Sequence, residues 1–121
     1  MGEQQRRLLR LNVCLLTAVT VPSTGKAQRA LTKDLGPMGA CLITNGLIEP
    51  KTVLVVELTL PDRDRPITFD AEVIWSKIVK PAEKVYEYPK AQTGIHITRI
   101  DPKDQAIMAQ YAQLNAATDS S

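Results

Sequence analysis

Three arginines near the start of the chain could bind a phosphate or another anion. Arg6, Arg7 and Arg10 fall within five residues, with no lysine among them, just before the first alternating apolar stretch. A guanidinium presents a planar fork of N–H donors that fits phosphate oxygens, and its face stacks on aromatic rings, including nucleobases. Residues 1–30 carry five basic groups and one acid, whereas the remaining residues carry ten basic and twelve acidic groups. Taken alone, this cluster is more typical of a solvated N-terminal arm; an anion-binding arm is the functional alternative.

A second candidate segment is Asp34-Leu35-Gly36-Pro37-Met38-Gly39. Two glycines and a proline in six residues predict an irregular path, outside any regular element, along which a ligand can approach the main chain. The Asp34 carboxylate only accepts hydrogen bonds, so it could take the adjacent N1–H and N2–H donors of a guanine edge. Taken alone, the segment is by default interpreted as a turn held by its aspartate side chain.

Few other residues suit catalysis or metal binding. Cys14 and Cys41 lie in apolar stretches, and the one histidine, His96, lies between two isoleucines. A nucleophile needs a neighbouring base, and a tetrahedral metal site needs more ligands than these three residues supply. The cysteines are therefore predicted to be small buried residues without a disulfide, and His96 to be a solvated or core-edge strand residue. We expect no enzyme, no metal and no cofactor.

The elements that position the candidate segments are predicted to be mainly strands, because the apolar residues alternate with a period of two. A hairpin is expected from the β-branched run at residues 53–60 and from residues 67–75. One face of its second strand is apolar: Ile67, Phe69, Ala71, Val73 and Trp75. Residues 77–90 carry six charges and two prolines and are predicted to be a loop. The expected strands are residues 11–21, 28–33 (a short stretch), 40–43, 53–60, 67–75 and 93–100.

One helix is predicted at the C-terminal end. Asp101 is a suitable N-cap, Pro102 suits the first helical position, and Asp104 suits the first turn. An apolar stripe then recurs at helical spacing: Ile107, Tyr111 and Leu114.

Six strands and one helix predict a mainly all-β protein, a six-stranded antiparallel β-barrel with a C-terminal α-helix. Closure of the barrel would leave no exposed sheet edge; an open sandwich is the alternative. We expect residues 1–10 to form a flexible arm, residues 11–115 the barrel with its helix, and residues 116–121 a disordered tail. Because no secretory signal and no apolar run of about 18 residues is found, we expect a cytoplasmic protein that does not insert into membranes.

The two candidate segments together resemble the PilZ family, whose domains are bacterial receptors for cyclic di-GMP. Arg6-Arg7-Leu8-Leu9-Arg10 has the pattern RxxxR, and residues 34–39 have the pattern DxGxxG, one residue away from [D/N]xSxxG. Residues 39–42, 71–75 and 93–97 resemble later strands of the family, and the last helix resembles its tail. The resemblance covers most of the chain, and it implies the six-stranded barrel and cyclic di-GMP as the ligand.

Carried over by position, the resemblance assigns roles to five residues. Arg6 and Arg10 would hold phosphates and guanine, with Arg7 as an auxiliary. Asp34 would accept hydrogen bonds from the other guanine edge. Gly39 would keep the turn clear of the ligand.

Gly36 stands where the family pattern has serine, so a hydroxyl that would hydrogen-bond the ligand is missing. One neutral hydrogen bond contributes on the order of 1 kcal/mol, or about tenfold in affinity. We expect binding to be weaker but retained, since charge-assisted bonds to the arginines and to Asp34 are about twice as strong.

Two functions from different classes follow. The first is a bacterial cyclic di-GMP receptor or adaptor in second-messenger signalling, whose arm and contacts with an unidentified protein partner change when the ligand binds. The alternative is a ligand-free PilZ-type adaptor that acts by protein contact in pilus assembly or motility. DNA or RNA binding has little support, because aromatic residues make up 4% of the chain and stacking platforms need more. The complete arginine pair favours the receptor.

Overall fold

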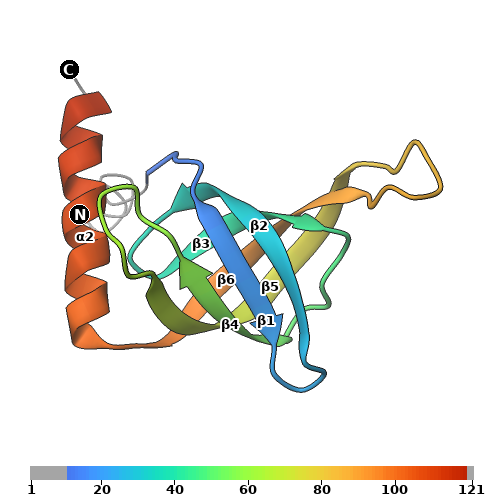
Figure 1. Ribbon diagram of the computed structural model, residues 1–121, viewed down its shortest axis with the longest axis horizontal. Helices are drawn as coiled ribbons and strands as arrows, with labels where there is room; N and C mark the ends of the chain where they lie inside the picture. Colours follow the sequence, from blue (N-terminus) through green and yellow to red (C-terminus); the bar gives the residue numbers. More distant parts are fainter. Residues whose placement is uncertain (1–10, 120–121) are drawn as a thin grey trace.

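The computed structural model describes the backbone of residues 11–119 and the side chains of residues 11–115 (Figure 1). Six antiparallel strands form a closed barrel in the order β1-β2-β3-β6-β5-β4. The strands are β1 (Leu16–Val21), β2 (Lys26–Leu35), β3 (Gly39–Asn45), β4 (Val53–Leu58), β5 (Ile67–Lys80) and β6 (Lys90–Ile100). Helix α2 (Pro102–Asp119) lies across one end of the barrel, at the left of Figure 1. The predicted barrel with a C-terminal helix is confirmed.

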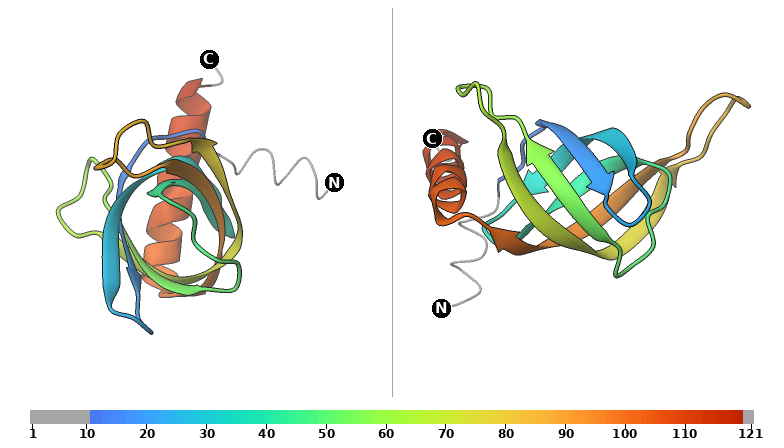
Figure 2. Two further views of the ribbon diagram at one scale, coloured as in Figure 1. Left: turned by 90° about the vertical axis from the view of Figure 1, so that its right-hand side faces the viewer. Right: turned by 60° about the horizontal axis from the view of Figure 1, so that its bottom comes forward.

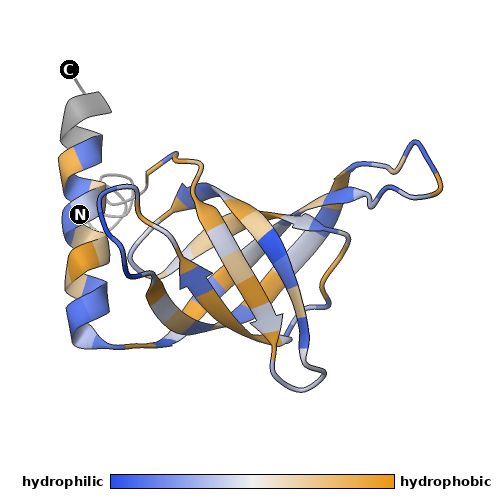
Figure 3. Cartoon of the chain, viewed as in Figure 1, coloured by the Kyte–Doolittle hydropathy of each residue, from blue (hydrophilic) through white to orange (hydrophobic). Residues whose placement is uncertain are grey.

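The core fills the barrel because alternate side chains of each strand point inward, and apolar residues recur along the strands in Figure 3. The inward face predicted for β5 is confirmed at four positions: Ile67, Phe69, Ala71 and Val73. Trp75, predicted on the same face, is 40% exposed, because the register shifts between Val73 and Trp75 and breaks the alternation. Its indole covers Gly94, where a Cβ would lie 2.3 Å from the Trp75 Nε1.

β4 and β5 form the predicted hairpin, with Leu58 opposite Ile67. The loop predicted at residues 77–90 is wrong at both ends. β5 continues to Lys80, β6 begins at Lys90, and these two residues pair as the strands project from the barrel on the right of Figure 1. Because both faces of this projection meet solvent, its strands do not alternate as the barrel strands do.

The first strands also differ from the prediction. β1 begins at Leu16 rather than Leu11, although Leu11 makes an isolated bridge to Leu35. β2 is ten residues long, because it includes the exposed, polar residues near Lys26 that conceal its alternation in the sequence.

Helix α2 begins as predicted. The Asp101 carboxylate accepts the Lys103 N–H at 2.8 Å, and the Asp101 carbonyl accepts the Gln105 N–H at 2.9 Å. The helix extends to Asp119, into the stretch expected to be a disordered tail.

The buried face of α2 differs from the predicted stripe. Ile107 and Tyr111 pack against the core as expected, but Leu114 is 62% exposed. Met108 and Ala112 are the helix residues that are buried. The reason is that α2 crosses the barrel end and contacts it along a short, narrow strip, beyond which Leu114 lies.

The residues first considered for chemistry have ordinary surroundings. Cys41 is buried as predicted, whereas Cys14 is exposed, because it alternates with the buried Leu11 and Leu15 in the extended segment before β1. His96 is an exposed strand residue, as predicted. Within residues 11–119 no helix is long and apolar enough to cross a membrane.

Candidate functional site

Residues 34–39 form a tight connection between β2 and β3. Gly36 N–H donates to the Gly39 carbonyl at 2.8 Å, which closes the turn. The expectation that no regular element would hold this segment is wrong at its ends, because Asp34 and Leu35 belong to β2 and Gly39 to β3.

A β-bulge positions Asp34. Strand pairing passes from Thr32 opposite Leu42 to Asp34 opposite Cys41, so Lys33 is an extra residue in β2. The Asp34 Oδ1 accepts the main-chain N–H of Cys41 at 3.2 Å, and the side chain is half-buried. This bond holds the carboxylate at the barrel wall, and an ionised carboxylate can accept several hydrogen bonds.

Gly39 lies where β3 approaches β6 closely. A Cβ at this position would lie 2.2 Å from the carbonyl oxygen of Ile95, a main-chain atom that cannot move aside alone. The neighbouring Met38 carbonyl accepts the Ile97 N–H at 2.8 Å, which holds the two strands together. The barrel itself therefore requires glycine here, whether or not a ligand binds.

Gly36 is buried within the turn but is not conformationally special. The glycines with positive φ in the described chain are Gly25 and Gly46. Position 36 therefore has a backbone conformation that serine can also adopt.

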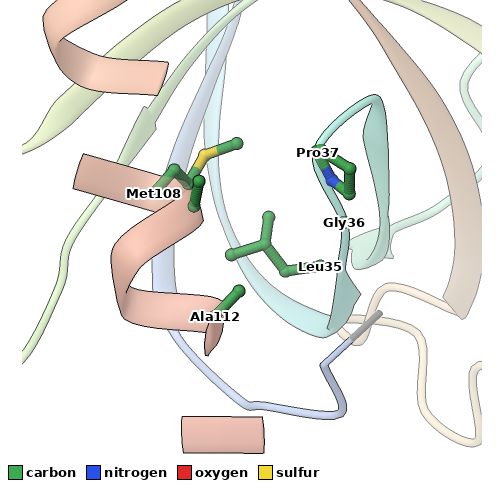
Figure 4. Close-up of a pocket in the computed structure, with 6 residues that line it drawn as sticks. Leu35, Gly36, Pro37, Met108 and Ala112 are labelled. Atoms are coloured by element: carbon green, nitrogen blue, oxygen red, sulfur yellow. The ribbon is translucent and has the colours of Figure 1, made fainter. Parts of the chain in front are cut away.

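Helix α2 packs on this turn. Leu35, Gly36 and Pro37 face Met108 and Ala112 across a small apolar cavity of about 20 Å³ (Figure 4). Leu35 is 1% exposed and points toward the helix in Figure 4. The turn and the helix thus share one packed contact, so a displacement of either one disturbs the other.

The described chain begins beside the same turn. Leu11 and Leu35 exchange two main-chain hydrogen bonds, each 2.8 Å long, and Leu11 is 3% exposed. The Thr32 hydroxyl secures the next residues, because it accepts the Leu15 N–H at 2.8 Å and donates to the Val13 carbonyl. The segment entering the barrel is therefore fixed alongside the end of β2.

Tyr111, at this end of the barrel, is a titratable group with a shifted pKa. Burial raises the pKa of the Tyr111 phenol, and the negative charge of Asp62 raises it further. Both residues line a groove of about 460 Å³ between α2 and the β4–β5 connection.

The predicted site residues fall into two groups. Three lie outside the described residues and stay predictions: Arg6, Arg7 and Arg10. Three others lie together at the β2–β3 connection, where Gly36 faces α2: Asp34, Gly36 and Gly39. Sequence reasoning missed the contribution of Leu11, Met108 and Ala112 to this end, although the i, i+4 spacing of Met108 and Ala112 is a signal that could have indicated a buried face.

Solved structures with this fold include proteins that bind cyclic di-GMP. The PilZ domain of YcgR from Escherichia coli, with c-di-GMP, has 12% identity and a TM-score of 0.68 over 92% of this chain and 90% of that chain. The K. pneumonia MrkH–c-di-GMP complex has 15% identity and a TM-score of 0.68 over 92% of this chain and 52% of that chain. Bacillus subtilis MotI/DgrA, an inhibitor of motility, has 19% identity and a TM-score of 0.65 over 88% and 50%.

The chain thus spans about half the length of MotI/DgrA and MrkH. Comparison with curated proteins gives no match. The family model of the PilZ domain matches residues 4–114, a span that includes both the arginine segment and the β2–β3 turn. With this match and the observed six-stranded barrel, the chain belongs to the PilZ domain family.

Proposed function

We propose that this protein is a receptor for cyclic di-GMP, which binds between residues 6–10 and residues 34–39. The observation that carries the proposal is the pairing of Leu11 with Leu35 through two hydrogen bonds of 2.8 Å. Leu11 directly follows Arg10 in the sequence, and Leu35 directly follows Asp34. The residue that follows the first motif is therefore held against the second motif.

The chemistry of the proposed site is electrostatic recognition. Arg6 and Arg10 donate charge-assisted hydrogen bonds to phosphate oxygens and to guanine, and Arg7 adds a third cation. Asp34 accepts the N1–H and N2–H donors of a guanine. Its bond to the Cys41 N–H orients the carboxylate before the ligand arrives, which lowers the ordering cost of binding.

The proposed affinity for the nucleotide is lower with Gly36 than it would be with a serine at this position. The missing hydroxyl corresponds to about 1 kcal/mol, and a bridging water can recover part of it. The charged contacts outweigh this loss, so the proposed ligand still binds.

The proposed response follows from what the turn touches. A nucleotide held by both motifs changes the conformation of the arginine segment and the charge and shape presented to a protein partner. Because Leu35 packs against Met108, the same event also acts on α2.

Titration calorimetry with cyclic di-GMP on the full chain tests the proposal. We expect a dissociation constant of about micromolar or lower, which rises with salt because charged contacts dominate. Arg29→Ala, on the exposed part of β2 away from the site, is the matched control and should bind normally. A flat trace at about ten micromolar protein would refute the receptor.

A ligand-free adaptor is the second candidate, and one observation favours it. The motif residues already have roles without a nucleotide, since Asp34 accepts the Cys41 N–H and Gly39 makes room for Ile95. Such an adaptor would act through protein contacts in pilus assembly or motility, and the flat trace described above would support it.

A further inference from the structure

The end of the barrel opposite α2 carries a groove that the proposed nucleotide site does not use. Its volume is about 1090 Å³, and it opens between β2, the β3–β4 connection and the base of the projecting hairpin. The left panel of Figure 2 looks into this end, with α2 behind the barrel. Its larger apolar or aromatic lining residues are Val19, Val21, Leu47, Ile48 and Tyr88.

β2 borders the groove with an edge that has no strand partner among the described residues. β1 pairs with β2 as far as Lys26, whereas pairing with β3 stops at Leu31 opposite Ile43. Asn45, the next β3 residue that could pair, instead donates its N–H to the Gln28 side-chain Oε1 at 2.9 Å. Residues 26–30 therefore have a neighbouring strand on one side.

The register shows which main-chain groups lie on the open side. Thr32 N–H donates to the Leu15 carbonyl at 3.0 Å, and in an antiparallel ladder the hydrogen-bonded pairs alternate. The even-numbered residues of β2, such as Gln28, therefore bond to β1. The N–H and C=O groups of Ala27 and Arg29 point the other way, toward the groove.

The charges around the groove favour an acidic occupant. Lys26 and Arg29 line it from β2, and both are exposed, whereas the acid that lines it is Glu49. A further cation, Lys90, lies beside it and donates to the Asn45 Oδ1 at 2.6 Å. Among the residues that line the groove, two cations against one carboxylate give a net positive charge.

We propose that this groove binds an extended, acidic segment of a partner protein, which adds as a strand to the open edge of β2. Main-chain hydrogen bonds to Ala27 and Arg29 would supply the pairing. Alternate side chains of the segment would enter the groove against Leu47 and Ile48, and the intervening carboxylates would lie on the outer face beside Arg29. Five residues of edge, about 17 Å, set the length of the segment.

A second copy of this chain fits the edge less well. Pairing two β2 strands would gather Lys26 and Arg29 from both copies in one small area, and like charges across strands destabilise a pair. Lysine on an open edge also discourages self-association in natural sheets. The same cations attract an acidic strand.

A pair of synthetic peptides tests the charge preference. One is a fluorescein-labelled octapeptide of alternating valine and glutamate; the matched peptide has lysine in place of glutamate. Fluorescence anisotropy with the full chain should show the glutamate peptide binding at least about tenfold more tightly. Equal binding of both peptides, or binding of neither, would overturn the proposal.

Two variants locate the site. Arg29→Glu should weaken binding of the glutamate peptide about tenfold, whereas Arg65→Glu, exposed in the β4–β5 connection, should leave it unchanged. Ala27→Pro removes one edge N–H at a position where proline is tolerated, and it should abolish binding while circular dichroism stays native. Peptide binding that survives both Arg29→Glu and Ala27→Pro would contradict this location.

Backbone methylation of the peptide tests strand addition on the unaltered protein. N-methyl groups on one alternate set of amides should abolish binding, and those on the other set should not, because only one set faces β2. If both methylated peptides bind like the parent, the segment does not add as a strand, and the proposal fails.

The inference is independent of the nucleotide site. Arg10→Ala, which should lose cyclic di-GMP, should bind the glutamate peptide normally. Sedimentation of the chain alone checks the competing occupant: self-association that Ala27→Pro removes would assign the edge to a second copy and overturn the proposal.

Discussion

At the α2 end of the barrel, Leu35 and Met108 are 1% and 2% exposed, whereas Leu47 and Tyr88 at the opposite end are 60% and 71% exposed. The first end buries its apolar side chains under a helix. The second leaves a strand edge and apolar side chains in contact with solvent. The same six strands thus end in two different kinds of surface.

The two ends should therefore differ in how ligand binding is coupled to the stability of the fold. At the α2 end, two described residues of the proposed nucleotide site, Asp34 and Gly39, also hold the fold, so changing them should alter stability as well as binding. At the open end, the proposed contacts are main-chain groups and exposed charges, so binding should change alone. The following predictions test this contrast, from the largest expected effect to the smallest.

Gly39→Ala should have the largest effect on stability, a loss of about 3 kcal/mol in the free energy of unfolding, because its Cβ would meet the Ile95 carbonyl at 2.2 Å. Chemical denaturation measures the loss. Met38→Ala, at a side chain that is 61% exposed, is the control and should change stability by less than about 0.5 kcal/mol. Wild-type stability of Gly39→Ala would show that the strands can separate at no cost.

Arg6→Ala and Arg10→Ala should each cost about 2–4 kcal/mol of cyclic di-GMP binding, as the loss of a charged contact does. Calorimetry measures binding, and the melting temperature of the ligand-free protein should hardly move. A variant that unfolds without ligand would instead assign these arginines to the fold.

Asp34→Ala should change both properties. Binding should weaken by about 2 kcal/mol, and stability should fall by about 1 kcal/mol because the Cys41 N–H loses its acceptor. Calorimetry and denaturation on the same preparation separate the two. Lower stability with unchanged binding would leave Asp34 a purely structural role.

Gly36→Ser should tighten binding about tenfold, the contribution of one hydrogen bond. Since the backbone at this position is open to serine, the variant should also be slightly stabilised through its unfolded state. Weaker binding would mean that the hydroxyl disturbs the contact with α2 rather than reaching the ligand.

The smallest effect concerns pH. Because the pKa of Tyr111 is raised above its usual 10.0 in the folded protein, its contribution to stability is present below pH 10 and is lost as the pH rises through the folded-state pKa. Tyr111→Phe should flatten this decline in denaturation curves measured between neutral and alkaline pH. An unchanged alkaline decline in the variant would assign the effect to other groups.

Much of the fold was predictable because its signals are local. The inward residues of β5 from Ile67 to Val73 follow from alternation, and the start of α2 follows from Asp101 and Pro102. These local signals failed where contact with a neighbouring element determines which side chains are buried. A bulge turns Trp75 outward, and the strip of barrel that α2 crosses selects Met108 rather than Leu114.

The candidate site was predictable to a lesser extent. The positions of Asp34 and Gly36 in one turn follow from their sequence separation. The two hydrogen bonds between Leu11 and Leu35 depend on how two distant segments meet, and no residue type in the sequence predicts them. The open edge of β2 was missed for the same reason, since it exists because β3 diverges after Ile43.

Gly39 has a consequence for how such motifs are interpreted. A residue that the barrel demands will be found in domains that bind a nucleotide and in domains that have lost it. Its presence therefore carries information about architecture and almost none about ligand. A search for functional receptors among similar chains should therefore rely on residues that the fold does not require. The arginines at positions 6 and 10 are then stronger evidence for ligand binding than the glycine that ends the second motif.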